Sequence, residues 1–189
     1  EQLIVERDYR WAAKILDELD TEALDAWDRQ RVRIQRSLCA SGMGDHGLAI
    51  DLLSQGVDGF EPISGYVRMW EARGFKSLGQ TDSATLRYES VIKNDQGWPL
   101  FKTAVYEAAR HYEALDNHEA AANAYQQMLD RGRKSSRAVL GLSRAIEASG
   151  DSSEAFRLRL RLIRDYPRSK EALTALRASE PLVGEKMTF

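Results

Sequence analysis

The sequence contains few of the residues that interrupt helices or cross-link a chain. The chain has 13 glycines and 4 prolines among 189 residues. Together they make up about 9% of the chain, whereas average usage is roughly 12%. The single cysteine, Cys39, permits no internal disulfide. No apolar run approaches the ~18 residues needed to span a bilayer, so no membrane insertion is expected. The scarcity of helix breakers favours long helices.

Motifs for catalysis and metal binding are also missing. The three histidines, His46, His111 and His118, lie in no H-E-x-x-H arrangement, and Cys39 has no C-x-x-C partner. Neither of the glycine-rich phosphate-binding motifs occurs. We interpret Cys39 as a small packing residue, His111 as a partly buried structural residue and His118 as a surface residue. The sequence therefore predicts no enzyme activity, no catalytic residue, no metal site and no cofactor.

Neither sign of charge dominates the chain, but the acidic and basic residues are unevenly distributed along it. The 27 basic and 29 acidic residues give a formal charge of −2, which argues against nucleic acid as a partner. Residues 1–30 hold nine acidic and four basic residues, whereas residues 131–170 hold eleven basic and four acidic ones. Homo-oligomerisation through these ends of opposite charge is one expectation. Within the basic region, one helix face carries Arg157, Arg161, Arg164 and Arg168.

Five alanines recur at nearly constant intervals. They are separated by 37, 35, 37 and 34 residues, at Ala12, Ala49, Ala84, Ala121 and Ala155. Most are followed four and seven residues later by large apolar or aromatic residues, for example Tyr125 and Met128. Twelve residues before the last four stand the small residues Ser37, Ala72, Ala109 and Ser143. Spacings of four and seven mark one helix face, and a small residue lets a second helix approach closely.

Short turn signals separate the two helices of each unit. They are Gly44-Asp45, Gly79-Gln80, Asp116-Asn117 and Gly150-Asp151. Glycine ends a helix in the left-handed conformation, and Asp or Asn caps the start of the next one. The pattern predicts helices at 7–19, 21–41, 45–55, 63–78, 81–94, 98–115, 117–130, 135–149, 151–165 and 169–178. Each unit is therefore a helix, a tight turn and a second helix.

These units resemble the tetratricopeptide repeat over nearly the whole chain. The clearest match runs from Ala138 through Gly150-Asp151 to Tyr166-Pro167. Two departures are Arg159, where the family has a large apolar residue, and the longer linker from Gly56 to Pro62. The resemblance implies an all-α, right-handed solenoid of antiparallel helix pairs, with about four pairs plus an extra N-terminal helix. We expect one domain over residues 1–189.

The first alanine lies on a second-type helix with no partner before it, and residues 180–189 lack a clear polar capping helix. Solenoid ends normally carry polar caps, so we expect the chain to be a segment of a longer protein. The drifting intervals resemble bacterial, envelope-associated relatives such as outer-membrane assembly factors and the helical domain of soluble lytic transglycosylases. This likeness implies an alternative function, as the helical accessory domain of a larger cell-envelope enzyme or assembly complex. It favours the bacterial periplasm or envelope over the cytoplasm.

Arginine recurs at one position of the first helices, eleven residues before the key alanine, at Arg73, Arg110 and Arg144. The family resemblance implies that this position faces a concave groove. Neighbouring positions on the same face complete the candidate ligand-binding residues: Arg31, Ile34, Tyr66, Met69, Arg73, Lys76, Thr103, Tyr106, Arg110, Arg137, Leu140 and Arg144.

Guanidinium groups beside apolar and aromatic side chains suit the binding of an extended or helical protein segment, including an acidic one. We therefore expect a non-enzymatic scaffold for protein–protein interaction. The alternative for the same arginines is a solvated face, on which Arg110 pairs with Glu113 and Arg144 with Glu147. The family's clamp of lysines and asparagines is absent, so capture of a free C-terminal carboxylate is not expected.

Overall fold

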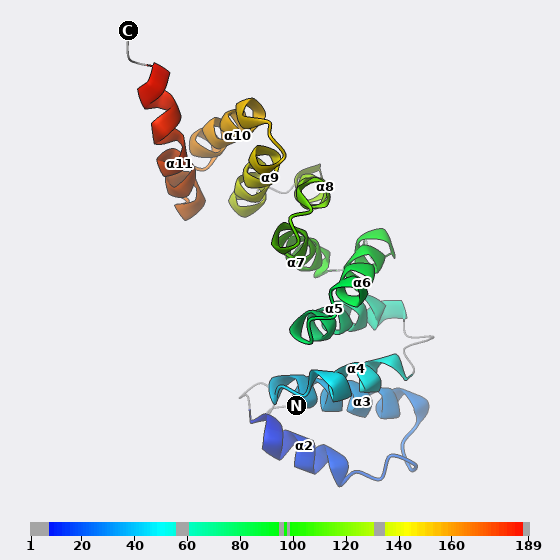
Figure 1. The fold of residues 1–189 in the computed structure, drawn as a ribbon. Helices are drawn as coiled ribbons and strands as arrows, with labels where there is room; N and C mark the ends of the chain where they lie inside the picture. The colour runs from blue at the N-terminus through cyan, green and yellow to red at the C-terminus, as the bar shows by residue number, and fades with distance from the viewer. Residues whose placement is uncertain (1–7, 56–60, 95–96, 98, 131–134, 187–189) are drawn as a thin grey trace. The chain divides into compact units, whose positions relative to one another are not determined.

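The computed structural model describes residues 8–55, 61–94, 97, 99–130 and 135–186, and all regular secondary structure within these ranges is helical. Figure 1 labels the helices in chain order. Their bounds are α2 Tyr9–Asp17, α3 Ala26–Gly42, α4 His46–Ser54, α5 Glu61–Ser77, α6 Thr81–Asn94, α7 Phe101–Ala114, α8 His118–Asp130, α9 Ser136–Ala148, α10 Ser152–Asp165 and α11 Lys170–Lys186. The predicted all-α fold is confirmed.

The chain divides into two compact units, Glu1–Phe101 and Lys102–Phe189. Unit 1 contains α2 to α6, and unit 2 contains α7 from Lys102 onward together with α8 to α11. A single domain over residues 1–189 stays a prediction.

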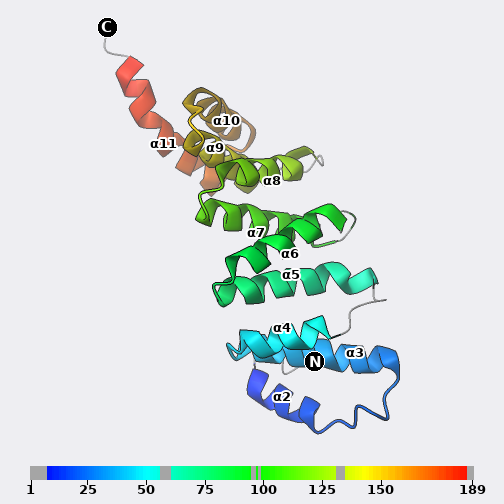
Figure 2. The same cartoon turned by 45° about the vertical axis from the view of Figure 1, so that its right-hand side comes forward.

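In unit 1, helices that are adjacent in sequence are packed against each other. α3 contacts α4, α5 contacts α6, and the pairs are linked by α4 against α5, while α2 lies against α3; Figure 2 shows this succession. The key alanines Ala49 and Ala84 are 5% and 0% exposed. Tyr88 and Val91, four and seven residues after Ala84, are also buried. The predicted helix face is therefore the packed one.

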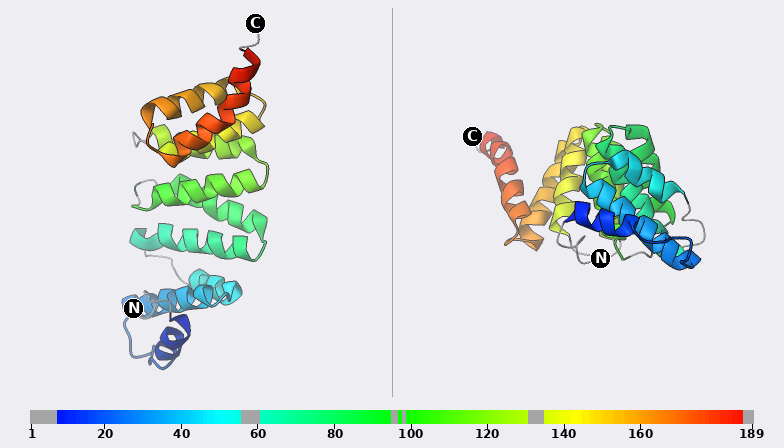
Figure 3. Two further views of the ribbon diagram at one scale, coloured as in Figure 1. Left: turned by 90° about the vertical axis from the view of Figure 1, so that its left-hand side faces the viewer. Right: turned by 90° about the horizontal axis from the view of Figure 1, so that it is seen from below.

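Unit 2 follows the same arrangement. α9 contacts α8 and α10, and α11 contacts both α10 and α9, as the left view of Figure 3 shows. α7 meets α8 through the rings of Tyr106 and Tyr125, whose centroids are 6.1 Å apart. Ala121 and Ala155 are fully buried. Together with unit 1, this gives the four predicted helix pairs, with α2 as the extra helix at the start.

The turns between paired helices form as the sequence predicts. Gly44, Gly79 and Gly150 have φ values of 88°, 71° and 99°, and Asp116 takes the equivalent left-handed conformation at 54°. The Asp45 carboxylate accepts a hydrogen bond from the Leu48 N–H at 3.0 Å. Asp151 caps α10 in the same way, through the Glu154 N–H at 2.9 Å. Each carboxylate satisfies an N–H that the helix start leaves unpaired.

Two predicted helix boundaries differ from the observed ones by five residues or more. The helix expected from residue 21 begins at Ala26, because Asp25 caps it by accepting from the Asp28 N–H at 2.7 Å. The last helix, expected to end at 178, continues through Pro181 to Lys186. Of the predicted linker, residues 56–60 lie outside the described residues, and Glu61 and Pro62 belong to α5.

Two interpretations, and one departure from the repeat, can be checked against burial. Cys39 is 0% exposed and His111 is 3% exposed, which confirms both as packing residues. Arg159, the charged residue at an apolar position of the repeat, is 2% exposed and pairs with Glu147 of α9. The repeat therefore tolerates this departure because a carboxylate from the paired helix meets the buried guanidinium.

Candidate functional site

The six candidate groove residues of unit 1 lie on α3 and α5. Arg31, Arg73 and Lys76 are exposed, and Ile34 and Tyr66 are half-buried. Arg31 pairs with Asp28 of its own helix at 3.3 Å. Met69 is a correction to the candidate set, because it is only 2% exposed and its side chain belongs to the packed interior.

The six candidates of unit 2 lie on α7 and α9. Thr103, Arg110, Arg137 and Arg144 are exposed, whereas Tyr106 and Leu140 are half-buried. Arg137 pairs with Glu171 of α11, with 3.6 Å between the Arg137 Nε and a carboxylate oxygen. Arg110 and Arg144, by contrast, are brought together.

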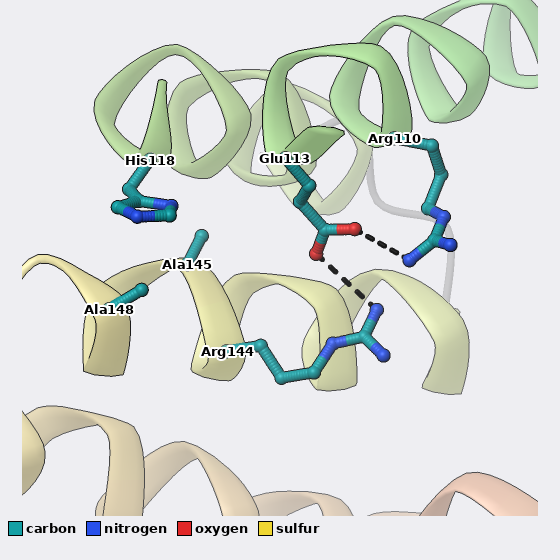
Figure 4. A pocket seen from close by; sticks show the side chains of 6 residues that line it. All are labelled: Arg110, Glu113, His118, Arg144, Ala145 and Ala148. Atoms are coloured by element: carbon teal, nitrogen blue, oxygen red, sulfur yellow. Dashed lines mark hydrogen bonds and ion pairs between the residues drawn. The ribbon is translucent and has the colours of Figure 1, made fainter. Parts of the chain in front are cut away.

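One carboxylate, that of Glu113, bridges Arg110 and Arg144. Its Oε2 accepts from Arg110 Nη1 at 2.7 Å, and its Oε1 accepts from Arg144 Nη2 at 3.3 Å, as Figure 4 shows. Glu113 and Arg110 are one turn apart on α7, but Arg144 reaches over from α9. The sequence spacing also allowed an Arg144–Glu147 pair; in the structure Arg144 contacts Glu113, and Glu147 contacts Arg159.

Beside this bridge lies a pocket of about 270 Å³, lined by Arg110, Glu113, His118, Arg144, Ala145 and Ala148. The His118 ring extends from the start of α8 toward the two alanines of α9 (Figure 4). Sequence reasoning placed His118 on the surface, and it is half-buried. His118 lines the pocket because α9 lies next to α8, and the local sequence pattern does not reveal that packing.

The charges of the bridge do not cancel, since two guanidinium groups face one carboxylate. The side chains of Arg110 and Arg144 are 50% and 46% exposed, and that of Glu113 is 16% exposed. Partial burial lowers the pKa of Arg110, but the Glu113 carboxylate outweighs this effect and raises the pKa above its ordinary value. Arg110 therefore keeps its charge, and the guanidinium groups of Arg110 and Arg144 each have N–H donors beyond the one that Glu113 accepts.

Tyr125 of α8 interacts electrostatically with all three charged groups of the bridge. Its side chain is fully buried, and its hydroxyl has no hydrogen-bond partner among the described residues. Burial raises the pKa of Tyr125, and the Glu113 carboxylate raises it further. The hydroxyl therefore stays protonated at neutral pH and remains a hydrogen-bond donor.

No family model matches the chain, and no curated protein sequence matches it. Solved structures do. The C-terminal part of a TPR repeat-containing protein from Cytophaga hutchinsonii gives a TM-score of 0.75 at 12% identity, over 95% of this chain and 69% of that one. The fold is that of the tetratricopeptide repeat. Structures of MamA (TM-score 0.68, 15% identity, 95% of each chain) and of PilW, a type IV pilus biogenesis factor (0.62, 16%, 89% of this chain and 81% of PilW), have the same fold.

In this tetratricopeptide-repeat fold, Arg110 and Arg144 occupy the same position in the first helices of two successive repeats. The repeat therefore explains why the two guanidinium groups lie side by side, and Glu113 holds them there. Such a pair can bind a carboxylate through charge-assisted hydrogen bonds. Within the described residues, no group of three or more His, Cys, Asp or Glu side chains is placed to hold a metal ion, and no helix is long and apolar enough to cross a membrane.

Proposed function

We propose that this chain is a non-enzymatic scaffold that binds a segment of another protein along the first helices of its repeats. The observation that supports this function is the Arg110–Glu113–Arg144 bridge with the pocket beside it. Two arginines held in place by one carboxylate retain unused donors and a net positive charge. This is the chemistry that recognises an acidic side chain.

The apolar surroundings of the bridge favour a protein segment over a small anion. Tyr106 precedes Arg110 by one turn of α7, and Leu140 precedes Arg144 by one turn of α9, and both side chains are half-buried. A bound segment thus meets an apolar or aromatic contact beside each guanidinium. Recognition of protein segments commonly combines apolar anchors with a few oriented polar groups.

The decisive test compares two double variants in affinity purification from native extract. R110A/R144A removes both guanidinium groups of the bridge. R157A/R161A is the matched control, because it also removes two exposed arginines, which pair with Glu154 and Asp165 of their own helix α10. The triple variant that adds R73A to the first pair measures the contribution of unit 1. Circular dichroism of each variant confirms that helicity is unchanged.

We expect proteins that the parent and R157A/R161A retain and that R110A/R144A loses. Equal retention by both double variants would overturn the assignment to this face of unit 2. If only R157A/R161A fails to retain proteins that the parent retains, binding is assigned to the basic face of α10. Assignment to the cell envelope, to a larger enzyme or to homo-oligomers through the charged ends stays a prediction.

A further inference from the structure

Tyr125 carries a hydrogen-bond donor that the described residues leave unused. The side chain is 0% exposed, and its hydroxyl has neither a protein partner there nor access to bulk water. Buried polar groups are nearly always hydrogen-bonded in native proteins. A buried hydroxyl that lacks a partner and interacts electrostatically with a charged cluster therefore points to a second arrangement of that cluster in which the hydroxyl is hydrogen-bonded.

Two contacts locate the hydroxyl. The Tyr125 ring meets Tyr106 of α7 edge-on, at 62° between the ring planes. Its Cζ, the atom that carries the hydroxyl, lies where a Cβ at Gly141 of α9 would have to be. Tyr106 stands one turn before Arg110, and Gly141 stands one turn before Arg144. The Tyr125 ring is therefore held against both α7 and α9, at positions one helical turn before Arg110 and Arg144.

The charged acceptor that acts most strongly on the hydroxyl is the carboxylate of Glu113. It raises the pKa of Tyr125 in addition to burial, whereas Arg144 and Arg110 lower it. The same carboxylate is engaged by both guanidinium groups. Glu113 thus contacts two donors, the guanidinium groups of Arg110 and Arg144, and interacts electrostatically with a third group that it does not contact, the Tyr125 hydroxyl.

We infer that, in the free protein, the Glu113 carboxylate occupies the site at which a carboxylate of the bound segment binds. When the segment displaces Glu113, the Glu113 carboxylate accepts a hydrogen bond from the Tyr125 hydroxyl. In the free protein, Glu113 neutralises and orients Arg110 and Arg144. An Asp or Glu side chain of the partner takes over the guanidinium donors, and the Glu113 carboxylate turns to accept the Tyr125 hydroxyl. This inference rests on the proposed function and names the group that the site recognises.

The charge count favours a single carboxylate as the ligand. Two guanidinium groups and Glu113 carry one net positive charge, which one monoanion balances. In the bound arrangement, each carboxylate has its own donors, because the ligand uses the arginines and Glu113 uses the tyrosine. Without the hydroxyl, the displaced Glu113 would be partly buried and unpaired, which is unfavourable. Tyr125 is therefore a positioning residue and need not touch the ligand.

The test uses sodium propionate, which has the carboxylate and short apolar stem of a glutamate side chain, on the full 189-residue chain. Propionamide is the neutral control, and sodium chloride keeps the ionic strength constant. Binding is followed by NMR at the Nε–H groups of Arg110 and Arg144 in the parent, E113A, Y125F and E113A/Y125F. Thermal unfolding of each protein without propionate reports any structural effect.

We expect E113A to bind propionate about tenfold more tightly, because an internal charged competitor is gone. Y125F is expected to bind about threefold or more weakly, although its unfolding temperature without propionate is unchanged or higher. In the E113A background, Y125F should have no effect on affinity, because the hydroxyl acts only through Glu113. The parent should not bind propionamide.

Each opposite result overturns a defined part of the inference. If Y125F binds propionate as tightly as the parent does, Tyr125 does not have the proposed role. If E113A binds propionate no more tightly than the parent does, the ligand does not displace Glu113. If neither the parent nor E113A binds propionate, the bridge is not a carboxylate-binding site. If the four affinities follow the expected order while affinity purification yields no arginine-dependent protein, the site chemistry stands and the scaffold function fails.

Discussion

The ring of Tyr125 lies against the backbone of Gly141, in the space that any larger residue at position 141 would occupy with its Cβ. Tyr125 comes from α8 and Gly141 from α9, so this contact sets how closely the two helices approach. It also aligns Arg144, one turn after Gly141, with the Arg110–Glu113 pair of α7. A glycine inside a helix is unfavourable for the helix itself, and here its missing side chain makes room for an aromatic ring.

We predict that Gly141→Ala destabilises the protein by about 1–3 kcal/mol, because the new methyl group forces the Tyr125 ring or α9 to move. In an open helix interior the same change would stabilise by up to about 1 kcal/mol. Gly47→Ala in α4 is the matched control, since a Cβ there would meet nothing closer than 3.8 Å. Urea unfolding of both variants is the measurement. A Gly141→Ala variant as stable as Gly47→Ala would show that the contact does not constrain the packing.

The buried Arg159 predicts an unequal response to the loss of either partner in its ion pair with Glu147. The side chain of Arg159 is 3% exposed and that of Glu147 is 42% exposed. Glu147→Ala leaves a buried charge without a partner and should cost about 3 kcal/mol. Arg159→Leu restores the apolar residue typical of the repeat, and Glu147 can then turn to water, so the cost should be below about 1 kcal/mol. Urea unfolding that ranks Arg159→Leu as the more damaging change would contradict this account.

Glu71 gives the stability of unit 1 a dependence on pH. It is 5% exposed on α5 and pairs with Arg87 of α6 at 2.9 Å. Burial raises the pKa of Glu71 above its ordinary value of 4.5, although Arg87 and Arg68 lower it. The folded state therefore holds this proton more tightly than the unfolded chain, and the resulting stability is fully present below pH 4.5 and is lost as the pH rises through the raised pKa.

Glu71→Gln removes that titration. The unfolding free energy of the variant relative to the parent should increase as the pH rises from 4.5 toward neutrality. Urea unfolding at a series of pH values measures this difference. A difference that is flat or decreases over that range would show that burial does not dominate the environment of Glu71.

Cys39 should report unfolding of its surroundings. The thiol is 0% exposed, and burial raises its pKa, so the reactive thiolate is scarce. We predict slow reaction with a disulfide reagent under native conditions and fast reaction in urea. Ser41→Cys, two residues further on at an exposed position of α3, is the control and should add one thiol that reacts rapidly. Rapid reaction of the Cys39 thiol in the parent under native conditions would be inconsistent with the packing of α3.

The repeat made most of the fold predictable. The intervals between alanines identified the buried faces, and the Gly-Asp signals located turns such as Gly150-Asp151, because both depend on residues that are close in sequence. The errors arose where local signals compete. Residues 19–24 contain enough apolar character to extend a helix, but Asp25 starts a new one. The last helix was expected to end at 178, but α11 continues through Pro181 to Lys186, although proline removes one N–H and crowds the preceding turn.

The candidate site was predictable only in part. The repeated arginine position was visible in the sequence, and Arg110 and Arg144 do lie side by side. The bridge by Glu113 was not foreseen, because Arg144 and Glu113 are 31 residues apart and meet only when α7 and α9 are adjacent. The burial of Met69 and the space left by Gly141 likewise depend on which helix packs against which.

The central claim, that the pocket beside the Arg110–Glu113–Arg144 bridge receives a partner segment, is tested most directly by photo-crosslinking. A benzophenone amino acid replaces Ala148, an exposed residue that lines the pocket, and in a control replaces Arg157 on α10. In native extract, we predict a discrete crosslinked protein from position 148 that disappears when R110A/R144A is added and is absent from position 157. A crosslink from position 148 that persists in R110A/R144A, or one obtained only from position 157, would contradict the account.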